Sequence, residues 1–198
     1  MRTIDHIAFS FEYAKDVLKI HGFLKFTGFV IGNIIPDYSY HTYHKNIGHN
    51  ISTARKKLAL AWLCEQQHGK GIIFYYRLGI TAHYICDSFT FPHNKQFHGN
   101  LTQHLRYEYM LHDAANEASF EPSGEIQLTF ASPNECMRYL ELAHFAYTKY
   151  SKKSPREDLN WISTISSTIL LSSLSFSSKH KATLCDILSK HKLIVQGK

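Results

Sequence analysis

The order of hydrophobic and polar positions along the chain predicts helices and few strands. Apolar residues recur at helical spacing from Ala8 to Ile20, and again from Ile47 to Gln67 opposite a basic face. The segment from Ile72 to Phe89 is apolar nearly all round, which is typical of a central helix. Further helices are predicted over residues 101–116, 132–150, 154–174 and 179–195. The pattern indicates an all-α bundle of about six to eight helices.

Two segments do not follow this simple pattern. Phe23 to Asp37 is apolar, rich in Gly and closed by Pro36, so we expect a buried turn or short helix that delivers Asp37 to the interior. A strand is the alternative, because β-branched residues are frequent there. Residues 118–131 are expected to form an exposed loop. No repeat or linker is visible, so residues 1–198 are predicted to form one domain, completed by the C-terminal helices at about 132–195.

The polar residues within the apolar pattern point to a metal site. His83 and Asp87 are four residues apart, as are His104 and Glu108, so each pair would project from one face of a helix. His93 lies between the pairs, in a segment broken by Pro and Gly. A helix, a loop and an antiparallel helix would bring three imidazoles and two carboxylates together. This is more than one tetrahedral zinc requires, so two or more metals are predicted.

Composition and charge indicate which kind of partner the protein binds and in which cellular compartment it is expected. The net charge of +6 and the pI near 9.1 favour an anionic partner, such as a phosphate-bearing substrate, a nucleic acid or an acidic membrane surface. The four cysteines form no C-x-x-C pair, and we expect them to be reduced. Charged residues interrupt the N-terminus where a signal peptide would be apolar, and Ser and Thr interrupt the apolar stretch 161–176. A cytoplasmic location is therefore expected.

The chain also resembles a known family. LGITAHYICDSFTFPH followed by QHLRYEYML is similar to the motif of the zinc-dependent phospholipase C family, whose fold is shared with single-strand-specific nucleases of fungi and plants. DHIAFSFEYAKDVL resembles the early helix of that family, and GNIIPD resembles a Gly-x-x-x-Pro-Asp pattern of its compact bacterial members. The resemblance covers about residues 5 to 111.

The resemblance implies a ligand set for two or three zinc ions. One ion would be held by Asp37, a histidine of the 41–49 cluster, His83 and Asp87. A second would take His93, His104 and Glu108, and a third would share Asp87 and take His6. From the cluster we select His44, because a helix beginning just after it would leave its side chain at the helix entrance; His41 and His49 are the alternatives. The third site departs from the family, because no processed N-terminal Trp precedes His6.

The activity that the resemblance implies is phosphodiester hydrolysis with a metal-activated water. Asp37 would be catalytic as well as a ligand, and no organic cofactor is needed. Phospholipid is favoured over nucleic acid as the substrate, with peripheral membrane contact and no obligate protein partner. The alternatives are a zinc nuclease and a catalytically silent zinc-binding protein. A further alternative is another class of helical metal phosphohydrolase, which would use His83, His112, Asp113 and Asp158.

Several residues in and around these motifs are not expected to be metal ligands. His112 continues the face of His104 and Glu108 by one turn, and we expect an exposed or core side chain there. Cys86 is expected to be buried packing. The remaining histidines are predicted on the surface: His21, His68, His98, His144, His180 and His191.

Overall fold

Helices make up all the regular structure of the described chain. A computed structural model describes residues 1–38, 49–118, 120, 130 and 132–176. Over these residues it contains seven α-helices and no strand, which confirms the predicted all-α bundle. The helices are α1 (Thr3–Glu12), α2 (Phe23–Tyr38), α4 (Ile51–His68), α5 (Ile72–Ser88), α6 (Leu101–Glu117), α7 (Pro133–Tyr150) and α8 (Pro155–Ser175). The helix predicted over residues 179–195 lies outside the described residues.

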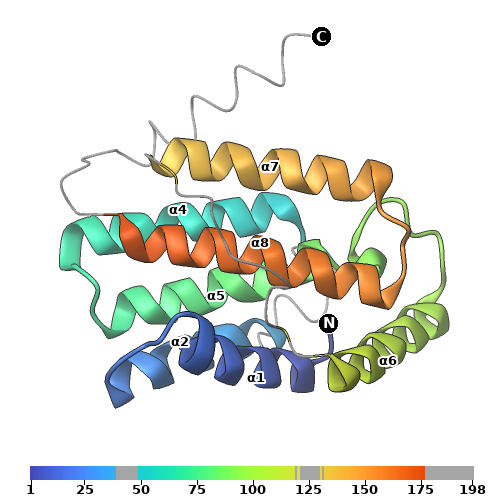
Figure 1. The fold of residues 1–198 in the computed structure, drawn as a ribbon, viewed down its shortest axis with the longest axis horizontal. Helices are drawn as coiled ribbons and strands as arrows, with labels where there is room; N and C mark the ends of the chain where they lie inside the picture. The colour runs from blue at the N-terminus through green and yellow to red at the C-terminus, as the bar shows by residue number, and fades with distance from the viewer. Residues whose placement is uncertain (39–48, 119, 121–129, 131, 177–198) are drawn as a thin grey trace, which may run out of the picture.

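Helix α5 runs through the middle of the bundle (Figure 1) and contacts α2, α4 and α8. Its apolar side chains are buried on several sides, and Leu78, Ala82 and Ile85 are fully enclosed. A helix enclosed in this way is apolar around its circumference, as its sequence indicated. Across the described ranges, no helix combines the length and the hydropathy that a membrane span requires.

Helices α2 and α5 pack almost backbone to backbone. A Cβ atom added to Gly32 would lie 2.0 Å from the carbonyl oxygen of Tyr76, and one added to Gly79 would lie 2.1 Å from that of Phe29. Both distances are far below van der Waals contact, so glycine is required at these positions. The glycines therefore permit a close helix pair, and residues 23–38 form a long helix rather than the predicted turn or short helix, or the alternative strand.

Helix ends follow the local sequence closely. Asn50 caps α4 by accepting a hydrogen bond from the Thr53 amide at 3.2 Å, and Ser132 and Ser154 cap α7 and α8 with Pro at the next position. The predicted Ser-Pro starts are thus confirmed. Helix α1 begins at Thr3 instead of Ala8, because Asp5 Oδ2 accepts the Arg2 amide at 3.2 Å and stabilises an earlier first turn.

Two short segments complete the framework. The five residues Tyr13–Val17 continue α1 as a π-helical turn, and Phe91–His93 form a 3₁₀ turn after α5. In the predicted exposed loop, residues 119, 121–129 and 131 lie outside the described residues, while Phe120 is buried against Phe9, so the prediction is wrong at that position.

Candidate metal centre

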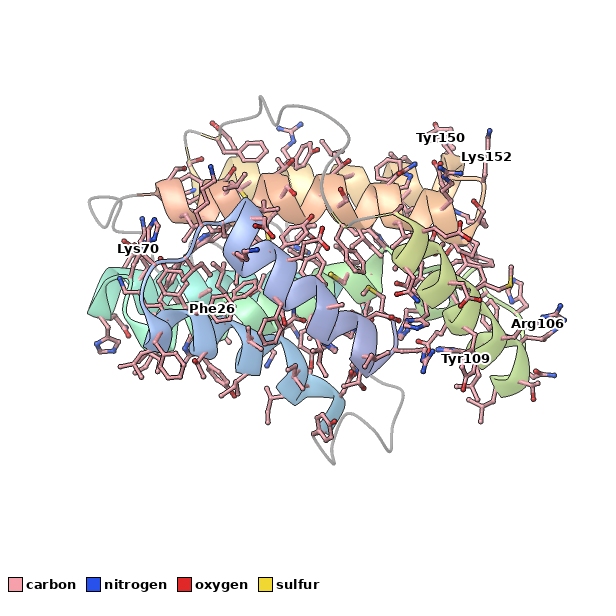
Figure 2. All side chains as sticks on the ribbon, turned by 60° about the horizontal axis from the view of Figure 1, so that its bottom comes forward. Phe26, Lys70, Arg106, Tyr109, Tyr150 and Lys152 are labelled. Atoms are coloured by element: carbon pink, nitrogen blue, oxygen red, sulfur yellow. The ribbon has the colours of Figure 1, made fainter. Side chains whose placement is uncertain are left out.

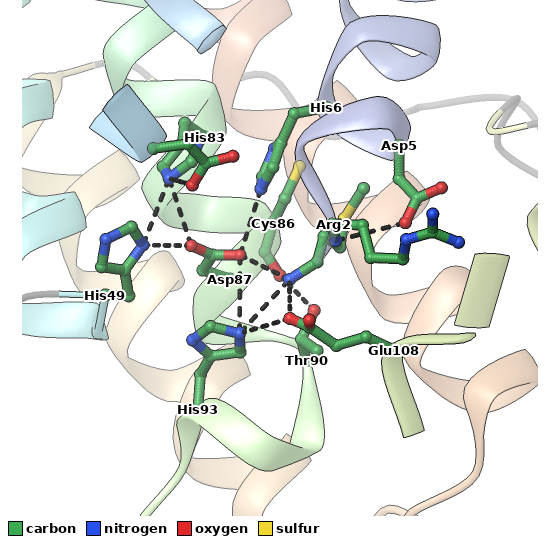
Figure 3. Close-up of polar contacts among 12 residues, drawn as sticks. Arg2, Asp5, His6, His49, His83, Cys86, Asp87, Thr90, His93 and Glu108 are labelled. Carbon is green, nitrogen blue, oxygen red and sulfur yellow. Dashed lines mark hydrogen bonds and ion pairs between the residues drawn. The ribbon is translucent and has the colours of Figure 1, made fainter. Parts of the chain in front are cut away.

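Seven of the eight side chains that the sequence marked as ligands converge at one end of α5, and the eighth, His44, lies outside the described residues. Figure 3 shows His6, His83, Asp87, His93 and Glu108 of this set. Helix α5 ends within one turn of Asp87, so the residues that follow it pass directly over the same end of the bundle. The contributing elements are α1 (His6), the last turn of α2 (Asp37), the residue before the N-cap of α4 (His49), α5 (His83 and Asp87), the 3₁₀ turn (His93) and α6 (His104 and Glu108).

The first group of ligand atoms surrounds His83. Its Nε2 lies 3.2 Å from Asp87 Oδ2 and 3.6 Å from Asp37 Oδ1, while its Nδ1 donates to the backbone oxygen of Asn33 at 2.9 Å. Burial lowers the pKa of His83 to about 4, so the ring is neutral and Nε2 carries a lone pair. A lone pair and two carboxylate oxygens then face one another. These three acceptors fit a bound cation, and the Asn33 carbonyl fixes the ring for it.

His49 completes this first group. Its Nδ1 lies 3.2 Å from His83 Nε2 and within a short hydrogen-bonding distance of Asp87 Oδ2. Ligand atoms of His49, Asp37 and His83 all lie within 4.8 Å of one another. Burial alone lowers the pKa of His49, but hydrogen bonding and attraction to Asp87 outweigh burial and raise it.

The second group consists of His93, His104 and Glu108. Glu108 Oε1 lies 3.2 Å from His93 Nε2 and 3.3 Å from His104 Nε2. Burial alone raises the pKa of Glu108, but the Met1 amino group and hydrogen bonds from the two imidazoles lower it strongly. The carboxylate is therefore ionised, as a metal ligand must be.

Asp87 joins the two groups and adds a third. Its Oδ1 lies 3.2 Å from His6 Nε2 and 2.8 Å from the Met1 amino nitrogen, which also lies 3.3 Å from Glu108 Oε1. Burial alone would raise the pKa of Asp87, but the amino group and the surrounding imidazoles keep it well below its usual value. The Met1 amino group thus lies between the carboxylates of Asp87 and Glu108.

Two polar atoms at the centre have no hydrogen-bond partner. Among the described side chains, Asp37 Oδ2 and His6 Nδ1 are buried without one. A buried carboxylate oxygen without a partner is unfavourable in the absence of a cation. Imidazole and carboxylate donors in this number are the ligands that zinc takes in proteins, so the residues present fit zinc.

Among the described residues, His49 is the member of the 41–49 cluster that reaches the site, and the choice of His44 from the sequence stays a prediction. His41 and His44 lie outside the described residues. The helix was predicted to begin at Ile47, but Asn50 caps it and Ile51 is its first residue. His49 is therefore the residue at the helix entrance. Recognition of Asn50 as an N-cap would have selected it from the sequence.

Asp158 supports the site from behind. Its Oδ2 accepts the Phe91 amide and the Tyr107 hydroxyl, both at 2.8 Å, and its Oδ1 accepts the Tyr147 hydroxyl at 2.7 Å. Phe91 begins the turn that carries His93, and Tyr107 precedes Glu108 in the chain. One buried carboxylate therefore ties both segments of the second group to α7 and α8.

The alternative phosphohydrolase site is not formed. His112 Nδ1 lies 2.5 Å from Asp5 Oδ1, Asp113 is exposed, and Asp158 is occupied by its three donors. In the part of the chain that the structure describes, none of His112, Asp113 and Asp158 belongs to a group of side chains that could hold a metal.

The sequence also predicted surface positions for the remaining histidines and a buried position for Cys86. His21, His68 and His98 are exposed, and Cys86 is buried, as predicted. His144 is only partly exposed, not a fully exposed surface residue as predicted, because it packs against Phe89 and its Nε2 donates to Asn94 Oδ1 at 2.9 Å. His180 and His191 lie outside the described residues.

Comparison with known proteins identifies a family. The sequence model of the family described as "Zinc dependent phospholipase C" matches residues 3–158, which span every ligand position described above. No curated protein and no solved structure matches the chain.

Proposed function

The chain belongs to the zinc dependent phospholipase C family, and we propose that it hydrolyses the phosphodiester bond of phospholipids. The observation that carries the proposal is the convergence of imidazole and carboxylate ligands around one end of α5 from six separate segments. Such a concentration of buried charge is unfavourable for a purely structural core, and it is common at sites that bind and polarise a substrate.

We propose that the centre holds two or three zinc ions. Asp37, His49, His83 and Asp87 would hold one ion, and His93, His104 and Glu108 would hold another. His6 and Asp87 would contribute to a third. When bound, zinc lowers the pKa of water and offsets negative charge on phosphate oxygens.

The residues of the chain supply orientation and proton transfer. Asp37 is assigned as the proton acceptor, because its side chain is 19% exposed, so that water can reach the carboxylate group. The Asn33 carbonyl holds the His83 ring in one tautomer, and Asp158 holds the turn of His93. Both supports limit movement of the ligands during turnover.

Phospholipid is favoured over nucleic acid by the residues beside the ligands. Tyr38 follows Asp37 and is exposed, and the exposed Leu101 and Leu105 flank His104 in α6. These apolar side chains suit the glycerol and acyl portions of a lipid. A single-stranded nucleic acid would instead require a groove that combines cations with stacking platforms.

The test compares hydrolysis of a chromogenic phosphocholine diester with hydrolysis of single-stranded DNA, each with and without a chelator. Zinc content is measured on the same samples. We expect chelator-sensitive turnover of the diester, and its loss in His83→Ala and Glu108→Ala. His21→Ala, at an exposed position, is the matched control. Turnover of DNA alone would assign a nuclease, and bound zinc without any turnover would assign a silent metal protein; either result would refute the phospholipase proposal.

A further inference from the structure

The exposed positions of α1 and α2 differ in character from those of α4 and α8. In α1 they are Ile4, Ala8 and Phe11, and in α2 they are Phe23, Leu24, Ile31, Ile35 and Tyr38. Every one is apolar or aromatic. The exposed positions of α4 and α8 are all polar, namely Ser52, Lys56, Gln67 and His68, and Arg156, Asn160, Thr164 and Ser175. Helices α6 and α7 also expose apolar residues, including Leu105 and Phe145, but each also exposes charged residues, whereas α1 and α2 expose no charged side chain.

The exposed residues of the two helices belong to one surface, which we call the α1–α2 surface. Phe11 of α1 contacts Phe26 of α2 edge to face, with ring centroids 5.5 Å apart. The start of α5 extends it, because the exposed Ile72 lies beside Gly28 of α2. Figure 2 turns this side of the bundle toward the viewer, with Phe26 and Tyr109 labelled.

This surface leads directly to the metal centre. Helix α1 carries His6 and α2 carries Asp37, so the helices that expose the apolar residues also deliver ligands. The most exposed side chains of the centre among those described are His104 at 24% and Asp37 at 19%. Tyr38, Leu101 and Leu105 adjoin them in the chain and are themselves exposed. The accessible edge of the centre is thus bordered by apolar residues.

Cations lie at the two ends of the surface. Lys15 and Lys19 are exposed in the segment between α1 and α2, where Asp16 pairs with Lys15 at 3.7 Å. At the other end, Arg2 stacks on the Tyr109 ring at 4.4 Å, and Arg106 of α6 is exposed. An apolar centre with basic residues around it is the pattern of helices that lie in the interface of anionic membranes.

We propose that the α1–α2 surface docks on an anionic phospholipid bilayer and presents the metal centre to the headgroups. This inference rests on the proposed phospholipase function, because a lipid phosphodiester is reached only at the membrane. A protein partner fits less well. Protein interfaces carry about one hydrogen bond per 100–200 Å², and among the exposed side chains of α1 and α2 only the Tyr38 hydroxyl can form one.

Sedimentation with vesicles tests the proposal on the full zinc-loaded chain. The vesicles contain phosphatidylcholine alone or phosphatidylcholine with phosphatidylserine. We expect binding to the anionic vesicles that weakens in high salt, and a loss of about tenfold or more in the double variant Phe23→Ser with Leu24→Ser. Leu24→Ser alone and Ile31→Ser provide milder changes should the double variant unfold. Leu142→Ser with Phe145→Ser is the matched control, because both residues are exposed apolar positions on α7.

The outcomes separate this inference from the proposed function. Hydrolysis of the soluble chromogenic diester should be unchanged in Phe23→Ser with Leu24→Ser, whereas hydrolysis of vesicle lipid should fall with binding. Vesicle binding without hydrolysis of either substrate would leave the docking surface supported and the phospholipase proposal refuted. Equal vesicle binding by the wild type, the α2 variants and the α7 control would overturn the docking surface. So would a concentration-dependent dimer that the α2 variants abolish, since the surface would then be an interface between two copies.

Discussion

Substitution of Gly32 by Ala tests how the contact between α2 and α5 sets the metal centre. The added Cβ would lie 2.0 Å from the Tyr76 carbonyl oxygen, whereas ordinary contact begins at 3.4 Å. The atom it meets belongs to the backbone of α5, so no side-chain rotation relieves the clash. The helices must move apart by about 1 Å or more.

The energy follows from two opposing effects. Alanine is favoured over glycine within a helix by about 1 kcal/mol, whereas overpacking costs about 1–3 kcal/mol or more. The backbone atoms on both sides cannot yield, so the clash prevails, and we expect a net destabilisation of about 2 kcal/mol. Asn33, the residue after Gly32, accepts a hydrogen bond of 2.9 Å from His83 Nδ1 through its carbonyl oxygen. A separation of about 1 Å breaks it and displaces Asp37 from His83.

Two measurements check this prediction. Urea unfolding of the chelated protein gives the change in stability, and competition with a chromophoric chelator gives zinc affinity, which we expect to fall by about 10–100-fold. Gly71→Ala is the control, since its Cβ would meet no atom within 4 Å. Stability within about 0.5 kcal/mol of the wild type and unchanged zinc affinity in Gly32→Ala would refute the reasoning.

Three further predictions concern single side chains. Asp158→Asn should remove one zinc ion from the protein by freeing the turn of His93, which zinc analysis after dialysis measures; full zinc content would contradict this. Burial lowers the pKa of His144 from 6.5 to about 4, so this imidazole binds a proton more tightly in the unfolded chain than in the folded one. The free energy of unfolding should therefore fall by about 2 kcal/mol as the pH falls from 6.5 to about 4, and it should fall by less in His144→Gln. Equal pH profiles of the two proteins in urea unfolding would exclude this role. His49→Ala should weaken zinc binding at least about tenfold while His44→Ala leaves it unchanged, and the reverse result would support the choice of His44 made from the sequence.

The sequence predicted the fold and the centre most accurately where local spacing decides position. The His83–Asp87 and His104–Glu108 pairs follow from helical geometry, and both pairs lie at the metal centre. Residues 23–38 were misjudged because glycine is usually read as a helix breaker, while here Gly32 serves a contact with α5 that is distant in sequence. The helix predicted from Ile47 begins at Ile51, and this shift of four residues brings His49 to the helix entrance, while the choice of His44 stays untested.

The scaffold around the centre was beyond prediction for a physical reason. Asp158 receives donors from segments up to 67 residues away, and no spacing within the sequence encodes such a meeting. The sequence showed only that Asp158 is a carboxylate in a helical segment, which suits a metal ligand as well as a hydrogen-bond acceptor. Only the packed structure shows that its oxygens are already engaged.

The position of Asp87 has a thermodynamic consequence for metal loading. One carboxylate contacts His6, His49 and His83, and its Oδ1 lies 3.9 Å from His93 Nε2. Ions in the proposed positions would therefore draw on the same negative charge, and occupation of one position alters the affinity of the others. Linkage requires this influence to be reciprocal, with the same factor in both directions. The zinc ions are thus expected to bind as a coupled set, with a titration curve that no sum of independent sites reproduces.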